Sequence, residues 1–335
     1  MTPVGGSMEY RALGRTGIDV SVLGFGCGDV GGLIVKGTLA ERKRAVTRAV
    51  ELGVNYFDTA SSYGSGVSEE HLGETLRELG LDVHVGTKVR LRPEDFGDIR
   101  GAVVRSLEAS LRRLGRPSVD LVQFHNPIGP ATAGTTLGVG EVLEEVLPAL
   151  EDLTRQGKAR FFGITANGDP EALHRVVGAG AIFTSQVFYN LLNPTAGGQA
   201  EGPFPGVDFK GLLPLAKRKR VGTIAVRALA GGALSGVRTK HPFASPSVSP
   251  IGSGPTYEDD VRAAEVFTKL VKDGFVRNLP EAAYRFIISH DAISTVLVGA
   301  STLEHLEQAA AAVFRGPLPA EALARVNELW KDLRG

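Results

Sequence analysis

The stretch NYFDTASSYGSGVSEEHLG, residues 55–73, contains a short apolar run, a polar turn and the start of a helical pattern. The apolar run Val54–Phe57 stops at Asp58, and a glycine-bearing loop follows until helical spacing begins near Ser68. A continuous apolar run of this length is typical of a strand that is buried on both faces of a sheet. The stretch therefore predicts one strand–loop–helix unit, with a carboxylate where the strand ends and Tyr63 in the loop.

The same unit recurs along the chain. The predicted strands are Val22–Gly26, Val54–Phe57, Val83–Gly86, Val119–Phe124, Arg160–Ile164, Ile182–Val187, Gly222–Val226 and Thr295–Val298. The predicted helices are Leu39–Leu52, Ser68–Leu79, Ile99–Leu114, Gly140–Gln156, Pro170–Val177, Lys210–Lys219, Pro280–Ser289 and Leu303–Phe314. Strands that alternate with helices favour a parallel sheet with right-handed crossovers. Eight such units predict an α/β fold, the eight-stranded parallel (β/α)8 TIM barrel, with a doubly wound open sheet as the alternative.

Both ends of the chain add to this barrel. Residues 8–20 predict a hairpin around Gly14–Gly17 that could plug one end of the barrel. Residues 319–333 predict a C-terminal capping helix, in which we expect Trp330 to serve packing. We therefore expect one barrel domain over residues 8–335, preceded by a flexible N-terminus at 1–7.

Three loops do not fit the simple repeat. Residues 126–140, 190–207 and 236–256 are long connections, and the last is rich in Pro, Ser and Gly. An extra helix is predicted after it, at 257–273. Long loops of this kind are often functional. Because loops that follow barrel strands lie on the catalytic face, we expect all three to shape a substrate pocket.

Composition excludes several classes of protein. Lys+Arg and Asp+Glu both number 37, so there is no basic excess for nucleic acid, and the basic run 217–220 is interpreted as a solvated helix end. A single cysteine, Cys27, excludes an intrachain disulfide. No apolar signal core or membrane-length run occurs, so a cytoplasmic location is expected. The scattered histidines predict no metal site.

Residues 26–31, GCGDVG, match the pattern G-x-G-x-x-G. That pattern marks a dinucleotide site only when a helix opens on the glycines. Helical spacing here begins only at Leu39, so a Rossmann site is not predicted. The glycines are interpreted as positions where the backbone runs close beneath a ligand.

Polar side chains follow three neighbouring predicted strands. They are Asp58 and Tyr63 after the second strand, Lys88 after the third and His125 after the fourth. Singly, each has a structural explanation, such as an ion pair between strands, rim packing or a strand cap. In a barrel, however, the carboxyl ends of the strands meet on one face, where active sites are assembled. The four groups are therefore predicted to form one catalytic site.

These residue types permit one kind of chemistry in particular. Tyrosine normally loses its proton near pH 10, and a nearby lysine ammonium lowers the pKa of the phenol. A carboxylate fixes that lysine, and a histidine can hydrogen-bond to a substrate oxygen. Tyr63 could then exchange a proton with a carbonyl or alcohol oxygen while a hydride moves. Because no side chain supplies hydride, a nicotinamide cofactor is required.

The chain resembles the aldo-keto reductase family over nearly its whole length. The matching motifs are LGRTGIDVSVLGFG, GVNYFDTASSYG, VGTKV, DLVQFHNP, QGKARFFGIT and VLVGASTLEHL, in family order. The resemblance implies an eight-stranded barrel that binds NAD(P) without a Rossmann motif. It places Asp58, Tyr63, Lys88 and His125 at the catalytic tetrad positions, with Tyr63 as the general acid/base.

The resemblance also implies a set of cofactor-binding positions. They are Gly26, Cys27, Asp58, Thr165, Asn167, Gln186, Arg227, Leu229, Gly231, Gly232, Gly299, Ser301, His305 and Gln308. Val226 stands where many members have an aromatic that stacks on nicotinamide. Ser301 stands where NADP-dependent members often have arginine, which favours NAD over NADP.

The tetrad and this NAD bias are similar to the aldose 1-dehydrogenase branch, which oxidises C1 of a cyclic sugar to a lactone. The leading hypothesis is thus an NAD(P)-dependent oxidoreductase that acts on a small carbonyl, alcohol or sugar substrate. The alternatives are an NADPH-dependent aldehyde or ketone reductase, a cofactor-binding regulatory subunit with little turnover, and a barrel lyase or isomerase without nicotinamide. The oligomeric state is left open.

Overall fold

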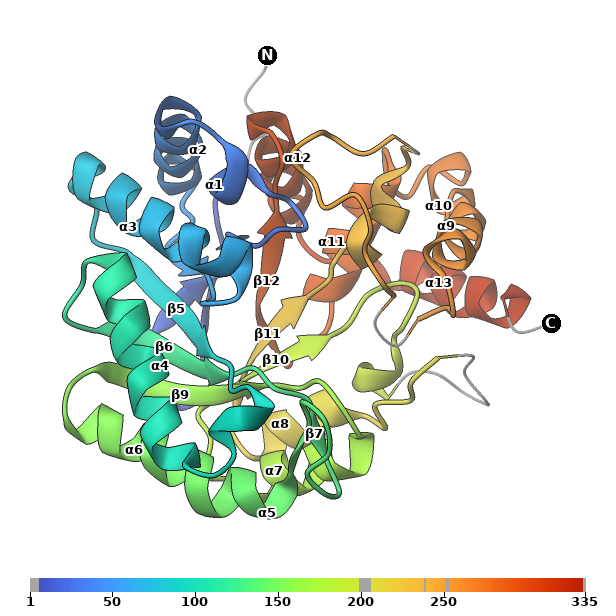
Figure 1. Cartoon of the computed structure of the whole chain (residues 1–335). Coiled ribbons are helices and arrows are strands. Elements are labelled where there is room, and N and C mark those ends of the chain that lie inside the picture. Colours follow the sequence, from blue (N-terminus) through green and yellow to red (C-terminus); the bar gives the residue numbers. More distant parts are fainter. Residues whose placement is uncertain (1–5, 199–205, 238, 251–252, 334–335) are drawn as a thin grey trace.

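The computed structural model describes residues 6–198, 206–237, 239–250 and 253–333. Eight parallel strands close into a barrel, in which the last strand returns to pair with the first (Figure 1). They are β3 (Leu23–Gly26), β4 (Tyr56–Asp58), β5 (His84–Val89), β6 (Val119–Phe124), β9 (Ala159–Thr165), β10 (Thr184–Phe188), β11 (Gly222–Val226) and β12 (Ile293–Gly299). The predicted barrel is confirmed, and closure excludes the open sheet.

The predicted helices surround the strands (Figure 1). They are α2 (Leu39–Glu51), α3 (Val67–Leu79), α4 (Ile99–Leu114), α6 (Leu147–Arg155), α7 (Pro170–Ala179), α8 (Leu212–Arg218), α11 (Leu279–Ile288) and α12 (Leu303–Val313). Their apolar faces and the outward side chains of the strands form one continuous core. Helix α12 lies beside α2, and an ion pair between Arg48 and Glu307 joins the last helix of the ring to the first.

The predicted helix Gly140–Gln156 is interrupted. Helix α5 (Val139–Glu141) is followed by a π-helical turn, Val142–Val146, and then by α6. Pro148 causes the break, because it has no N–H to donate to the carbonyl of Glu144 four residues earlier. That carbonyl instead accepts a hydrogen bond from Arg100 at 2.7 Å.

The predicted helix 257–273 is also divided, into α9 (Tyr257–Val266) and α10 (Lys269–Lys272). The hydroxyl of Thr268 donates to the carbonyl of Glu265 at 2.6 Å and so competes with the helical pattern at this point.

A one-turn helix, α1 (Leu33–Lys36), lies where the sequence predicted loop until Leu39. One turn is too short to produce a readable period. The residue before it, Gly32, has a left-handed φ of 81°. A further small difference is the two-stranded sheet of β7 (Ile128–Gly129) and β8 (Leu137–Gly138) within the loop 126–140.

The N-terminal hairpin plugs the end of the barrel at which the strands begin. It pairs β1 (Tyr10–Ala12) with β2 (Asp19–Ser21) in antiparallel register. Its apolar side chains meet inward-facing residues of the barrel in a separate small core of Leu13, Ile18, Val20, Tyr56, Leu121, Ile224 and Leu297. Gly14, with a φ of 57°, lets the hairpin backbone approach Gly222 at the start of β11.

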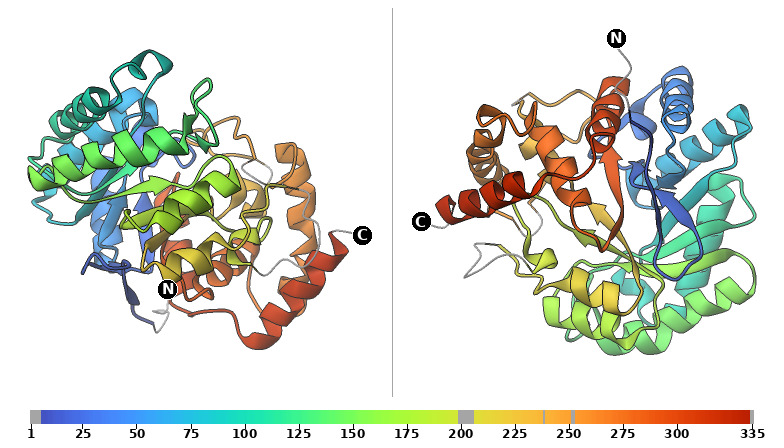
Figure 2. Two further views of the ribbon diagram at one scale, coloured as in Figure 1. Left: turned by 90° about the horizontal axis from the view of Figure 1, so that it is seen from below. Right: turned by 180° about the vertical axis from the view of Figure 1, so that it is seen from behind.

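The C-terminal helix α13 (Ala320–Asp332) lies at the periphery of the molecule (Figure 2). Trp330 is buried on this helix, donates its indole N–H to the carbonyl of Leu191 at 2.8 Å and packs edge-on against Phe286. The expected packing role is confirmed.

Parts of three predicted segments lie outside the described residues. They are residues 1–5 of the N-terminus, residues 199–205 of the loop 190–207, and residues 238 and 251–252 of the loop 236–256. In the described part of the chain, no helix is both long and apolar enough to cross a membrane.

Candidate active site

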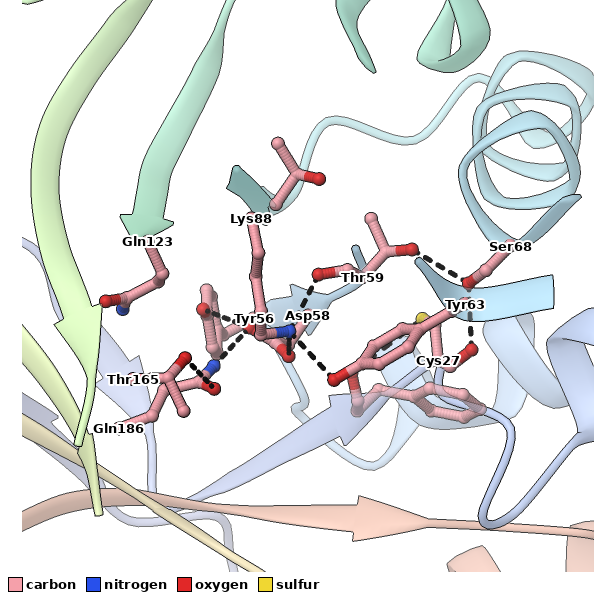
Figure 3. Close-up of polar contacts among 12 residues, drawn as sticks. Cys27, Tyr56, Asp58, Thr59, Tyr63, Ser68, Lys88, Gln123, Thr165 and Gln186 are labelled. Carbon is pink, nitrogen blue, oxygen red and sulfur yellow. Dashed lines mark hydrogen bonds and ion pairs between the residues drawn. The ribbon is translucent and has the colours of Figure 1, made fainter. Parts of the chain in front are cut away.

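Lys88 lies at the centre of the candidate site (Figure 3). Its side chain, on β5, has no exposed surface. The ammonium donates to a carboxylate oxygen of Asp58, to the carbonyl of Thr59 at 2.8 Å and to the hydroxyl of Tyr63 at 3.1 Å. The structure therefore brings three of the four predicted catalytic residues into direct contact through a single cation.

Asp58 receives hydrogen bonds on both carboxylate oxygens. One oxygen contacts Lys88, and the other accepts from the Tyr56 hydroxyl at 3.1 Å and from the Gln186 amide at 2.6 Å (Figure 3). Burial raises the pKa of Asp58, although Lys88 and the two other donors act in the opposite direction. Burial also opposes the charge of Lys88, but Asp58 and Tyr63 outweigh it and raise the pKa of the ammonium. Lys88 is therefore charged at neutral pH.

Tyr63 differs from the expectation in one respect. Burial raises the pKa of its phenol, and the nearby Lys88 reduces that rise without reversing it. The expected effect of the lysine is present, but the loss of hydration outweighs it. At neutral pH Tyr63 is a protonated phenol, able to donate a proton to an oxygen beside it and to leave a phenolate next to an ammonium.

His125, the residue directly after β6, lies beside Tyr63. Its ring is perpendicular to the ring of Tyr63, with 6.1 Å between the centroids. Burial, with the nearby cations Lys88 and Arg90, lowers the pKa of His125 to about 3. The imidazole is therefore neutral at pH 7. Its Nδ1 is buried and has no hydrogen-bond partner within the described residues.

A cavity of about 900 Å³ opens at the carboxyl ends of the strands, above these groups. Three of the predicted catalytic residues line it, Asp58, Tyr63 and His125, while Lys88 lies beneath its floor. Other predicted positions that line it are Gly26, Thr165, Asn167, Gln186, Arg227, Leu229, Gly231, Gly232, Gly299, Ser301, His305 and Gln308. Their binding of a cofactor remains a prediction, but the barrel brings all of them to one cavity.

Cys27 is the exception among the predicted cofactor positions. Its side chain is buried in the core and does not line the cavity. Burial raises the pKa of its thiol, so the group is a poor nucleophile. Cys27 lies one residue past β3, where its side chain points away from the cavity.

The lining of the cavity fits an extended dinucleotide. Arg227 and Lys240 bring positive charge to the wall that follows β11, and the left-handed glycines Gly231 and Gly232 leave backbone close to the cavity. Cations and exposed backbone groups are the usual partners of a pyrophosphate. In the part of the chain that the structure describes, no three His, Cys, Asp or Glu residues lie close enough to hold a metal ion.

Several residues at the site were not predicted from the sequence. Tyr56 was interpreted only as part of an apolar run, although a spacing of two residues on a strand puts it on the same face as Asp58. Arg90 lines the cavity directly after the end of β5, and its place after a barrel strand could have indicated it. Asp29 and Lys240 also line the cavity, but they lie in loops where no local pattern marks them.

The fold and the site together define a closed parallel barrel that holds a tyrosine hydroxyl against a buried lysine at the carboxyl ends of its strands. The model of the Aldo/keto reductase family matches residues 22–331, and the chain therefore belongs to this family of oxidoreductases, whose members bind a nicotinamide cofactor.

The relatives of this chain include both enzymes and channel subunits. The chain is 31% identical to L-galactose dehydrogenase of Arabidopsis thaliana, over 91% of this chain and 88% of that protein. It is 28% identical to a putative voltage-gated potassium channel subunit beta of Schizosaccharomyces pombe, over 96% of this chain and 93% of that one. Among solved structures, the holo form of aldo-keto reductase AKR11C1 from Bacillus halodurans is similar, with a TM-score of 0.71 and 25% identity over 96% of each chain.

Proposed function

We propose that the protein interconverts a carbonyl and an alcohol with a nicotinamide cofactor, that it prefers NAD to NADP, and that its substrate is the C1 position of an aldose. The observation that carries the proposal is the buried ammonium of Lys88, which contacts both Asp58 and the hydroxyl of Tyr63. The likeness to L-galactose dehydrogenase supports a sugar substrate.

In the proposed mechanism, each residue of the tetrad has a separate role in proton transfer. When bound, nicotinamide accepts or supplies the hydride. In the reducing direction Tyr63 donates its phenolic proton to the carbonyl oxygen, and Lys88 stabilises the phenolate that remains. In the oxidising direction the phenolate takes the proton of the hydroxyl. The neutral imidazole of His125 hydrogen-bonds the reacting oxygen, and Asp58 holds the ammonium in place.

The preference for NAD is supported by the end of the cavity beyond β12. The hydroxyl of Ser301 already donates to the carbonyl of Gly31 at 2.6 Å, and its side chain is buried. Burial, with the neighbouring His241, lowers the pKa of His305, so this imidazole is neutral at pH 7. A 2′-phosphate placed here would lack a cation among Gly299, Ser301, His305, Gln308 and Ala309, the described lining residues from the end of β12 onward.

A paired oxidation screen tests the proposal. Wild type and Tyr63→Phe are assayed with NAD⁺ and with NADP⁺ against a panel of aldoses and simple alcohols. We expect turnover of at least one aldose, with a higher kcat/KM for NAD⁺. Tyr63→Phe should lose at least about 10²-fold in kcat, since it removes the proton donor, while its affinity for NADH, measured by fluorescence, stays within a few-fold.

Three results would contradict the proposal in different ways. Binding of NADH without turnover of any substrate would favour a regulatory subunit. Absence of any nicotinamide binding would favour a lyase or isomerase. Wild-type rates in Tyr63→Phe would remove this residue from the mechanism.

A further inference from the structure

The turn that carries Tyr63 has an unusual backbone. Three successive residues, Gly64, Ser65 and Gly66, have left-handed φ values of 55°, 55° and 100°. L-residues do not propagate this conformation, so the turn lacks the repeating hydrogen bonds of a right-handed helix. Within the turn the N–H of Ser65 donates to the carbonyl of Ser62 at 3.4 Å, and contacts from outside the turn add to this bond.

Residues 28–35, which follow β3, supply three contacts to this turn. Gly28 lies beneath the Tyr63 ring, so closely that a Cβ at this position would come within 3.3 Å of the ring. Both carboxylate oxygens of Asp29 accept from the backbone N–H of Gly64, at 3.0 and 3.2 Å. Val35 packs against Gly64, where an added Cβ would lie 2.7 Å from its methyl group.

The same segment is fixed on its other side to the loop after β12. The Ser301 hydroxyl donates to the carbonyl of Gly31 at 2.6 Å, and the N–H of Leu33 donates to the carbonyl of Ala300 at 3.2 Å. Gly31 also leaves no room for a side chain, because a Cβ there would lie 2.5 Å from the backbone of Gly299. The carboxylate of Asp29 is thus held by the barrel itself rather than by a free loop.

Asp29 forms no ion pair with any residue that the structure describes. The carboxylate lines the cavity, yet the hydrogen-bond partner that it has is the N–H directly after Tyr63. A charged acceptor on a backbone N–H forms a stronger hydrogen bond than a neutral one. Losing it would free the turn to move the phenol away from the ammonium of Lys88, 3.1 Å away.

We propose that Asp29 is a positioning residue for Tyr63, which clamps the turn after the tyrosine and so keeps the phenol in contact with Lys88. Its kinetic consequence rests on the proposed function. The clamp itself does not, because it can be observed in the protein without turnover.

The test compares Asp29→Ala with Asp29→Asn, and uses Asp98→Ala as the matched control. Asp98 also accepts a backbone N–H, that of Gly101 at 3.1 Å, but at the start of α4 and outside the cavity lining. Hydrogen exchange is followed in the peptides that contain Gly64 and Gly101. Kinetics follow kcat, KM for the cofactor and the pH profile.

In Asp29→Ala we expect faster exchange at Gly64 only, and a fall in kcat of about 10- to 100-fold with KM for the cofactor within about 3-fold. The basic limb of the pH profile should move to higher pH, because the ammonium no longer acts on the phenol. Asp29→Asn should bring both the exchange rate at Gly64 and kcat to within about 3-fold of the wild-type values, since an amide oxygen can still accept from Gly64. Asp98→Ala should speed exchange at Gly101 and leave kcat unchanged.

Unchanged exchange at Gly64 in Asp29→Ala would overturn the clamp, whatever the kinetics. Equal loss of kcat in the Asn and Ala variants would also overturn it, because charge rather than the hydrogen bond would then matter. If wild type turns over no substrate, the proposed function fails, and exchange at Gly64 alone still decides whether the clamp exists.

Discussion

At the residue scale, the site depends on a buried cation that is fully compensated. An ammonium without exposed surface loses its hydration and stays charged only when partners replace that hydration. Lys88 has three acceptors in Asp58, Thr59 and Tyr63, and Asp58 in turn has further donors in Tyr56 and Gln186. We therefore expect stability and catalysis to depend on the same pair of charges.

Lys88→Met should lower both the stability of the fold and the rate of catalysis. Removing one partner of a buried ion pair leaves Asp58 uncompensated, which costs about 3–5 kcal/mol of unfolding free energy. We also expect kcat to fall by at least about 10²-fold, because the phenolate of Tyr63 loses its cation. Urea unfolding and initial rates measure the two effects.

Lys158→Met is the matched control for this prediction, because Lys158 pairs with Glu108 at 2.6 Å with both side chains part-exposed. We expect a loss below about 1 kcal/mol there and no change in kcat. Similar losses in the two variants would argue against a special role for the buried pair. Adding Asp58→Asn to Lys88→Met should recover part of the stability.

The lowered pKa of His125 predicts that the free energy of unfolding depends on pH. Its pKa is about 3 in the folded protein and about 6.5 in an unfolded chain. Between these values the unfolded chain binds a proton that the folded protein does not, so this contribution to stability falls as the pH drops below about 6.5. With its partial exposure taken into account, we expect a loss on the order of 1–3 kcal/mol between pH 7 and pH 4. Urea midpoints at both pH values, for wild type and His125→Gln, measure it; an equal slope in both would contradict it.

At the element scale, the two ends of the barrel serve different purposes. The hairpin of β1 and β2 fills the end where the strands begin, whereas the loops that follow the strands build the cavity at the other end. This division is the general one for barrels, in which one face carries chemistry and the other stability. Tyr56 and Leu297 belong to both the small core under the hairpin and the site, but Leu13 belongs only to that core, so we expect its truncation to act mainly on stability.

Leu13→Ala tests this division. Leu13 is fully buried at the tip of the hairpin, so its truncation should cost about 2–5 kcal/mol of unfolding free energy while kcat stays unchanged. Tyr10→Phe is the control: it removes only the half-exposed hydrogen bond to the carbonyl of Gly53 and should cost about 1 kcal/mol or less. A large fall in kcat for Leu13→Ala would show that the two ends are coupled.

At the scale of the whole molecule, closure of the barrel joins the first and last strands, and α13 returns across the outside. We expect residues 8–335 to unfold as one unit. Trp330, the only tryptophan, reports the docking of α13, while circular dichroism reports all helices. Thermal transitions followed by the two signals should coincide. A fluorescence transition at clearly lower temperature would mean that the C-terminal helix detaches first.

The sequence by itself determined the repeating unit and the four groups at the strand ends. Both are local properties: a buried parallel strand is a short continuous apolar run, and a residue that follows it lies at the mouth of the barrel. Asp58, Tyr63, Lys88 and His125 were found in this way. Pro148 indicates a break in the predicted helix Gly140–Gln156, but not its π-helical form, because the compensating donor, Arg100, lies on another helix.

Only the tertiary structure decided how these groups interact. Gln186 reaches Asp58 across 128 residues of sequence, and Asp29 meets Gly64 across 35, because closure of the barrel sets both distances. The burial of Cys27 and the raised pKa of Tyr63 were likewise decided only by the tertiary structure. A chain pattern gives the identity and order of polar groups, but desolvation and hydrogen-bond geometry depend on every element packed around them.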